Sequence, residues 1–152
     1  MVSKLAGVLL SLVTLTAVGC QGTGGNEKFA SAQQALQSVA ANYPSLVRLT
    51  LHAMPQGEAQ MKAIASTSAD KCGKPSDPED IAAVKDGKES VLEEGDNLDV
   101  TLPIADTNGH RIAAAGVTLK SNGRTRDQLI ADARTIAGQL GSAVRAAGKP
   151  LW

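Results

Sequence analysis

The stretch Leu98-Asp-Val-Thr-Leu-Pro-Ile-Ala-Asp-Thr-Asn-Gly-His-Arg-Ile-Ala-Ala-Ala-Gly-Val-Thr-Leu-Lys120 decides the fold. Apolar residues at 98, 100 and 102 alternate with Asp99 and Thr101, which is the pattern of a half-buried strand. The turn-forming run 106–109 leads into a longer strand over 111–120, with small residues at its centre. This stretch therefore predicts two neighbouring antiparallel strands.

Three further strands are expected on either side of this pair. The run 48–53 alternates polar and apolar residues, residues 61–67 form the returning strand, and 90–93 precede a turn at 94–97. Short strands joined by hairpin turns favour one antiparallel sheet whose apolar face is covered by helices. The expected class is α+β with a five-stranded sheet.

Three helices complete the expected order. Apolar residues at three- and four-residue spacing predict a long N-terminal helix over about 27–43, ended by Pro44. Asp77-Pro-Glu-Asp80 is a capping pattern for a short helix over about 78–86, with Gly87 at its exit. A second capping box, Thr125 with Gln128, opens a C-terminal helix that Gly148-Lys-Pro150 stops.

The first 20 residues resemble the signal and lipobox of bacterial lipoproteins. Lys4, an apolar stretch over 5–18 and the small residues before Cys20 form an export signal too short to span a bilayer. The resemblance implies cleavage after Gly19 and acylation of Cys20. An ordinary secretory signal followed by a chance cysteine is the alternative.

The expected organisation is a signal peptide over 1–19, a Gly-rich tether over 20–26 and one domain over 27–152. Lipid on Cys20 would attach the protein to a membrane of the bacterial cell envelope. Gln21 is not the aspartate that enterobacterial lipoproteins would associate with inner-membrane retention, so we expect the outer membrane, facing the periplasm, if the source has two membranes. Acylation of Cys20 would leave only Cys72, so no intrachain disulfide is expected. Cys72 is then a packed or idle thiol, or forms an intermolecular disulfide.

Charge argues against nucleic acid as a partner. The chain has 15 basic and 15 acidic residues, and cleavage of the signal removes one lysine. Nucleic-acid binding needs clustered Lys and Arg and a basic balance. Acidic residues gather in 70–99 and basic residues in 111–149, which could orient a ligand or a partner but is also typical of a solvated surface.

The order of elements and turns resembles the Cache superfamily of PAS-like extracytoplasmic sensor domains. The resemblance rests on five motifs with Gly87 and Gly109 between them: Ala63-Ile-Ala-Ser-Thr67, Gly73-Lys74, Ser76-Asp-Pro-Glu-Asp80, Leu98-Asp-Val-Thr-Leu-Pro-Ile-Ala-Asp106 and Gly116-Val-Thr-Leu119. It implies the sheet order 2-1-5-4-3 and a ligand pocket between the sheet and the short helix. The chain lacks the aromatic-rich pocket signature of amino-acid-binding members, so the identity of a ligand does not follow from the resemblance.

Five residues are candidates for ligand binding: Arg48, His52, Lys62, Ser66 and Lys74. Arg48, Thr50 and His52 share one face of the first strand, and Lys62 and Ser66 lie on its expected neighbour. Arginine can bind a carboxylate through two hydrogen bonds. Lys74 stands before a helix start that attracts anions, although Asp77, Glu79 and Asp80 favour neutral or cationic ligands there. The alternative, which we favour, is the solvent face of an edge hairpin.

No catalytic or metal site is expected. His52 and His110 are the only histidines, without a close-spaced Cys or His partner, and are expected on the surface. Cys72 has no identified base, and no cofactor motif occurs. The expected function is a lipid-anchored module, not an enzyme, that binds or senses a small molecule and acts through an envelope protein. A structural or protein-interaction lipoprotein without a ligand pocket is the alternative.

Overall fold

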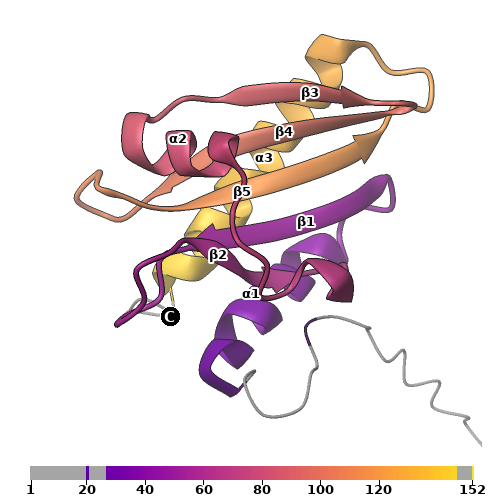
Figure 1. Cartoon of the computed structure of the whole chain (residues 1–152). Coiled ribbons are helices and arrows are strands. Elements are labelled where there is room, and N and C mark those ends of the chain that lie inside the picture. Colours follow the sequence, from indigo (N-terminus) through magenta and orange to yellow (C-terminus); the bar gives the residue numbers. More distant parts are fainter. Residues whose placement is uncertain (1–19, 21–26, 147–151) are drawn as a thin grey trace, which may run out of the picture.

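The computed structural model describes Cys20, residues 27–146 and Trp152. Its centre is a five-stranded antiparallel sheet in the order β2-β1-β5-β4-β3 (Figure 1). The strands are β1 (Leu46–Ala53), β2 (Lys62–Ser66), β3 (Ser90–Glu94), β4 (Asn97–Ala105) and β5 (Arg111–Lys120). The predicted α+β class, the five strands and their order are confirmed.

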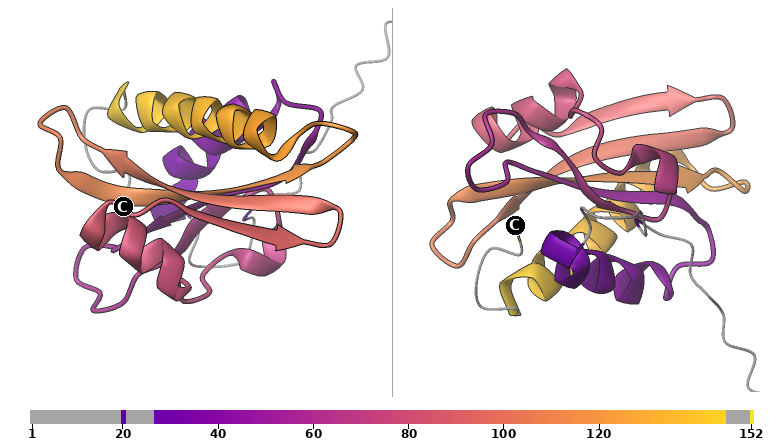
Figure 2. Two further views of the ribbon diagram at one scale, coloured as in Figure 1. Left: turned by 90° about the horizontal axis from the view of Figure 1, so that it is seen from above. Right: turned by 60° about the horizontal axis from the view of Figure 1, so that its bottom comes forward.

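Helices lie on both faces of the sheet. α1 (Ala30–Ala40) and α3 (Arg126–Ala146) pack side by side on one face, and α2 (Pro78–Asp86) lies on the other (Figure 2, left). Two short 3-10 helices, η1 (Glu27–Phe29) and η2 (Ala69–Lys71), complete the elements. One face is therefore closed by two helices, whereas α2 covers part of the other.

The predicted capping boxes set the starts of α2 and α3. The carboxylate of Asp80 accepts the backbone N–H of Asp77 at 3.0 Å. The backbone N–H of Thr125 donates to Gln128 Oε1 at 2.9 Å, and that of Gln128 donates back to Thr125 Oγ1 at 3.3 Å. Each box satisfies amides that have no partner within the helix. Gly87, with φ of 71°, ends α2 in the left-handed region.

The N-terminal helix is shorter than the predicted 27–43. It begins as η1, continues as α1 and ends at Ala40. Pro44 disfavours helical backbone at the residue before it, Tyr43. The last amides therefore bond three residues back, from Asn42 to Val39 at 3.1 Å and from Tyr43 to Ala40 at 3.0 Å.

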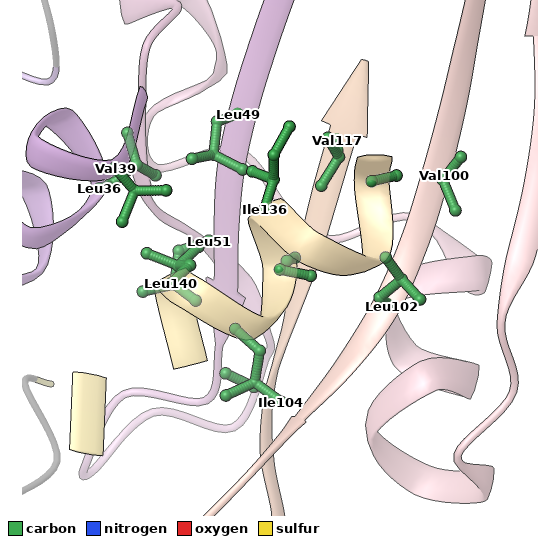
Figure 3. Packing of buried hydrophobic residues seen from close by; sticks show 14 of the residues in the cluster. Leu36, Val39, Leu49, Leu51, Val100, Leu102, Ile104, Val117, Ile136 and Leu140 are labelled. Carbon is green, nitrogen blue, oxygen red and sulfur yellow. The ribbon is translucent and has the colours of Figure 1, made fainter. Parts of the chain in front are cut away.

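The core lies between the sheet and the pair α1 and α3 (Figure 3). Residues from α1, β1 and α3 meet there with no exposed surface, including Leu36, Leu51, Ile136 and Leu140. Each such side chain contributes about 1.5–3 kcal/mol by leaving water. Small residues of β5 on this face bring α3 close to the sheet. The alternate residues of the same strands face α2, where they form a different and polar surface.

Cys20 and Cys72 form a disulfide, with their Cα atoms 5.6 Å apart. The expectation that no intrachain disulfide exists is wrong for the chain in this structure. That expectation assumed that the Cys20 sulfur carries a lipid, and one sulfur cannot hold a thioether and a disulfide together. Acylation of Cys20 remains an expectation that requires this disulfide to be absent.

Other predictions for the chain ends lie outside the described residues. These are the signal peptide over 1–19, the tether over 21–26 and the helix stop at 148–150. Within residues 27–146, no helix is both long enough and apolar enough to cross a membrane.

Candidate ligand-binding site

A polar pocket of about 150 Å³ lies between the sheet and the start of α2. Its floor comes from strands β1, β2, β4 and β5, and its wall comes from residues 71–80. The lining residues are Arg48, Thr50, His52, Ala63, Lys71, Lys74, Pro75, Asp77, Glu79, Asp80, Asp99, Thr101 and Gly116. The pocket is thus in the place that the Cache resemblance implies.

Gly116 opens the middle of the floor. Strand pairing places it between Thr50 on β1 and Thr101 on β4, in one row across the sheet. A Cβ built on Gly116 would lie 3.8 Å from His52 Nε2, which is ordinary contact distance. Because Gly116 has no side chain, the space between Thr50, Thr101 and His52 stays open. A larger residue at this position would fill that part of the floor.

Arg48 and Asp99 close one end of the floor. Thr118 of β5 pairs with both, so their side chains meet above it. Arg48 Nη2 lies 3.4 Å from Asp99 Oδ2 and 3.5 Å from Glu94 Oε2, and Thr118 donates to Asp99 Oδ1 at 2.9 Å. The Arg48 charge is neutralised by these carboxylates, so it does not present a free cation to the pocket.

His52 and Asp80 meet at the other end, beneath the first turn of α2. His52 Nδ1 lies 3.2 Å from Asp80 Oδ2 and 3.0 Å from Ser76 Oγ. Burial lowers the pKa of His52 to about 4, a change that Asp77 opposes and Lys71 and Arg48 reinforce. Burial also raises the pKa of Asp80 to about 7, against the stabilising bond from the Asp77 amide. The imidazole is therefore neutral at pH 7, with the carboxyl close to half-protonated.

Two floor groups face the pocket without a protein partner in the part of the chain that the structure describes. Every hydrogen bond or ion pair of His52 runs through Nδ1, which leaves Nε2 beside Gly116. Thr101 as a residue is 4 % exposed, and its hydroxyl bonds to no described residue. Neither atom is among the buried side-chain atoms that lack a partner, so both are open to the pocket, where a ligand or water can bond to them.

The structure brings together three of the five candidate residues. Arg48 and His52 line the floor and Lys74 lines the wall. Ser66 lies beside Thr50 in the same face, but it is fully buried and bonds to the Thr50 hydroxyl at 2.9 Å. Lys62 points to the other face, near the Phe29 ring and paired with Glu58. Neither Ser66 nor Lys62 lines the pocket.

His52 is not the surface histidine that the sequence predicted. Its side chain is 12 % exposed, because α2 covers it, whereas that of His110 is 78 % exposed, as expected. Asp99, Thr101 and Gly116 are among the pocket residues that were not recognised as candidates. Asp99 and Thr101 are the polar residues of the alternating strand, so their position facing away from the core was available as a signal.

The geometry does not match two familiar kinds of site. In a Ser-His-Asp triad the serine and the carboxylate bind different ring nitrogens, but here both lie on Nδ1 of His52. Among the described residues, no group of three His, Cys, Asp or Glu side chains could hold a metal ion. What the pocket offers chemically is a set of hydrogen-bonding groups around a small volume.

Comparison with known proteins gives the fold. No family model and no curated protein matches the chain. A GAF domain/HD domain protein from Geobacter sulfurreducens superposes with a TM-score of 0.52 at 8% identity, over 78% of this chain and 92% of that chain. The chain has a GAF-like fold.

Two further solved structures agree. A type II free methionine-R-sulfoxide reductase from Thermoplasma acidophilum has a TM-score of 0.54 and 14% identity, over 78% of this chain and 92% of that one. The GAF domain of an Acinetobacter phosphoenolpyruvate-protein phosphotransferase has a TM-score of 0.50 and 10% identity, over 82% and 96%. At these identities the likeness extends to the five-stranded α+β architecture and no further.

Proposed function

We propose that this protein is a lipid-anchored, extracytoplasmic module with a Cache-like domain that binds a small molecule. The observation that carries the proposal is that His52 Nε2 and the Thr101 hydroxyl, which have no protein partner among the described residues, belong to residues lining a pocket whose floor Gly116 leaves open. Both groups are therefore available to a small molecule that enters the pocket. The GAF-like and sensor-type fold of its structural neighbours supports a binding role.

The pocket suits a small polar molecule without net charge. Arg48 is balanced by Asp99 and Glu94, and His52 is neutral at pH 7. On the wall, Lys71 and Lys74 face Asp77 and Glu79. A cavity of about 150 Å³ can hold a molecule of benzene's size, so about six non-hydrogen atoms fit. The binding groups are donors and acceptors rather than a cluster of one charge.

Anion binding at the start of α2 is less favoured. The Asp80 carboxylate already accepts the Asp77 N–H, and three acidic side chains lie in this turn. An added anion would displace that bond and approach like charges. We therefore propose neutral compounds first, and small carboxylates as the competing class.

The anchor determines how such a module could act. A lipid on Cys20 would hold the domain from one side of the membrane, facing the periplasm if the source has an outer membrane. A domain so attached reports its state through a second envelope protein, and we propose no catalytic step. Cys20→Ser should shift the chain from the membrane to the soluble fraction. A variant that stays membrane-bound would contradict the anchor.

Thermal-shift screening of the detergent-solubilised full chain tests binding. Ligand that binds the folded state at 100 times its Kd stabilises by about 2.7 kcal/mol, a shift of several degrees. We expect neutral polar compounds of this size to raise the midpoint, with Thr101→Val abolishing the effect. If no compound of either class raises it, the rival interpretation, a structural or interaction lipoprotein, is supported instead.

A further inference from the structure

The Cys20–Cys72 disulfide attaches the start of the domain to the segment that walls the pocket. Cys72 lies between Lys71 and Lys74, both of which line the pocket. The two cysteines are 52 residues apart in sequence. A bond at this point therefore constrains the wall from outside the sheet.

Backbone hydrogen bonds carry that constraint along the wall. The Gly73 N–H donates to the Ala63 carbonyl at 2.8 Å, and the Ala63 N–H donates to Lys74 at 2.9 Å. Ser76 then bonds to Met61 through its N–H and to His52 Nδ1 through its hydroxyl. The segment from Cys72 to Ser76 thus extends the edge of β2 and ends on the pocket histidine.

The other end of the disulfide lies at a junction of three elements. Cys20 is 7 % exposed, and its sulfur lies 4.0 Å from the Ser66 carbonyl oxygen. The Gln33 side chain of α1 bonds to both the N–H and the carbonyl of Ser66, each at 3.0 Å. The Ser66 hydroxyl reaches Thr50 in the pocket floor. The Cys20 sulfur in this position is bonded to Cys72 and cannot carry an acyl chain.

We propose that the Cys20 sulfur has two exclusive fates, a thioether to the lipid anchor or a disulfide to Cys72, and that the choice sets the pocket wall. In the disulfide form, the wall is fixed between β2 and His52. In the acylated form, Cys20 leaves its site, Cys72 is a free thiol and the wall is held by backbone bonds alone. The inference deepens the proposed function, because it concerns the regulation of the same pocket.

Formation of the Cys20–Cys72 disulfide requires an oxidant. Two thiols, at Cys20 and Cys72, react with one disulfide of an envelope thiol oxidant. A Cys72 thiolate attacks that disulfide, one thiol leaves, and Cys20 then displaces the second from the mixed disulfide. The chain loses two hydrogens as the oxidant gains them, and the pocket side chains take no part.

The two histidines provide a direct test. The lipid-free full chain is purified in detergent and closed with oxidised glutathione or opened with dithiothreitol, and intact mass checks both its redox state and the absence of lipid. The pKa values of His52 and His110 are then followed by NMR, with His110→Gln giving the assignment. Opening should move the His52 pKa from about 4 toward 6.5, because a looser wall relieves the burial that mainly lowers this pKa and moves the Lys71 charge away. The exposed His110 should not change.

Cys72→Ser gives a control that needs no reductant. It should have the raised His52 pKa under both conditions, with the dispersed spectrum of a folded sheet. The same His52 pKa in the open and closed chains would overturn the proposal, and so would loss of the whole fold on opening. Neither readout uses a ligand. A negative result here therefore overturns the proposed disulfide control without testing whether the pocket binds a ligand.

The membrane fraction provides the second arm. Chains whose mass includes the lipid should each have one maleimide-reactive thiol after denaturation and reduction, on the Cys72 peptide. Chains without lipid should have none before reduction and two after it. Lipid-free chains with two reactive thiols before reduction, in an oxidising envelope, would contradict the exclusive choice.

Discussion

His52 Nδ1 lies 3.2 Å from Asp80 Oδ2, where β1 passes beneath the first turn of α2. The two side chains are 12 % and 5 % exposed, so burial dominates the protonation of both. Burial disfavours the charged form of each group, which moves the two pKa values in opposite directions past one another. Between about pH 4 and 7 the pair holds one titratable proton and contributes no net charge to the pocket.

This relationship predicts opposite pH responses for the two single variants. Asp80, with a pKa raised to about 7, makes stability fall as pH rises from about 4 to 7. His52, with a pKa lowered to about 4, makes stability fall as pH drops from 6.5 toward 4. In the wild type between pH 4 and 6.5, these two opposite dependences of stability on pH nearly cancel.

Urea unfolding across this range distinguishes the contributions. The free energy of unfolding of Asp80→Asn should fall by about 1 kcal/mol for each pH unit of acidification. That of His52→Asn should fall by a similar amount for each unit by which the pH is raised. Parallel pH profiles for the two variants would contradict the assignment. His110→Asn, at an exposed position, is the control and should follow the wild type.

Removal of the disulfide should lower the free energy of unfolding. The bond closes a loop with a sequence separation of 52 residues, and native disulfides typically contribute about 2–4 kcal/mol. Reduction of the wild type and the Cys72→Ser change should lower the urea midpoint equally. Dithiothreitol should have no effect on Cys72→Ser. An unchanged midpoint after reduction would show that the bond does not stabilise the fold.

Arg48 should be needed for stability more than an exposed arginine. Arg48→Gln leaves the half-buried Asp99 without its cation, so we expect a loss of about 1–2 kcal/mol in urea unfolding. Arg126 lies 4.0 Å from Glu93, with side chains 55 % and 76 % exposed. Arg126→Gln should change stability by less than about 0.5 kcal/mol. If Arg48→Gln lowers the free energy of unfolding no more than Arg126→Gln does, the Arg48–Asp99 ion pair contributes little to stability.

Gly87 and Gly138 should respond oppositely to alanine. Gly87 has φ of 71°, and an added Cβ would lie 3.3 Å from Arg111 Nη1, so Gly87→Ala should destabilise by about 1 kcal/mol or more. Gly138 lies in α3 with open space around it, and Gly138→Ala should stabilise by about 0.5–1 kcal/mol. Thermal unfolding of both variants checks the left-handed exit of α2.

Local patterns predicted most of the fold. Alternation in β4, the capping box at Asp77 and that at Thr125 depend on neighbours in sequence, so their elements were found within a few residues. The sheet order came from the Cache resemblance rather than from any residue pattern. Apolar spacing did not predict where α1 ends. The spacing continues to Tyr43, although Pro44 prevents helical backbone there.

The errors at the site have long-range causes. The register between β1 and β2 shifts between Leu51 and His52, so that Ala53 rather than Met54 lies opposite Lys62. One extra residue turns a strand's side chains to the other face, which removed Lys62 from the pocket. The burial of His52 depends on α2 packing over the sheet. The pairing of Cys20 was missed because its sulfur was assigned to a lipid.

Titration calorimetry of the wild type and Gly116→Ala, with a neutral compound found by thermal shift, tests the pocket most directly. The added methyl group fits at ordinary contact distance, so the variant should fold, but it fills the space between Thr50 and Thr101. We predict binding heat for the wild type and Gly138→Ala, and none for Gly116→Ala. Equal binding by all three proteins would contradict a ligand site in this pocket.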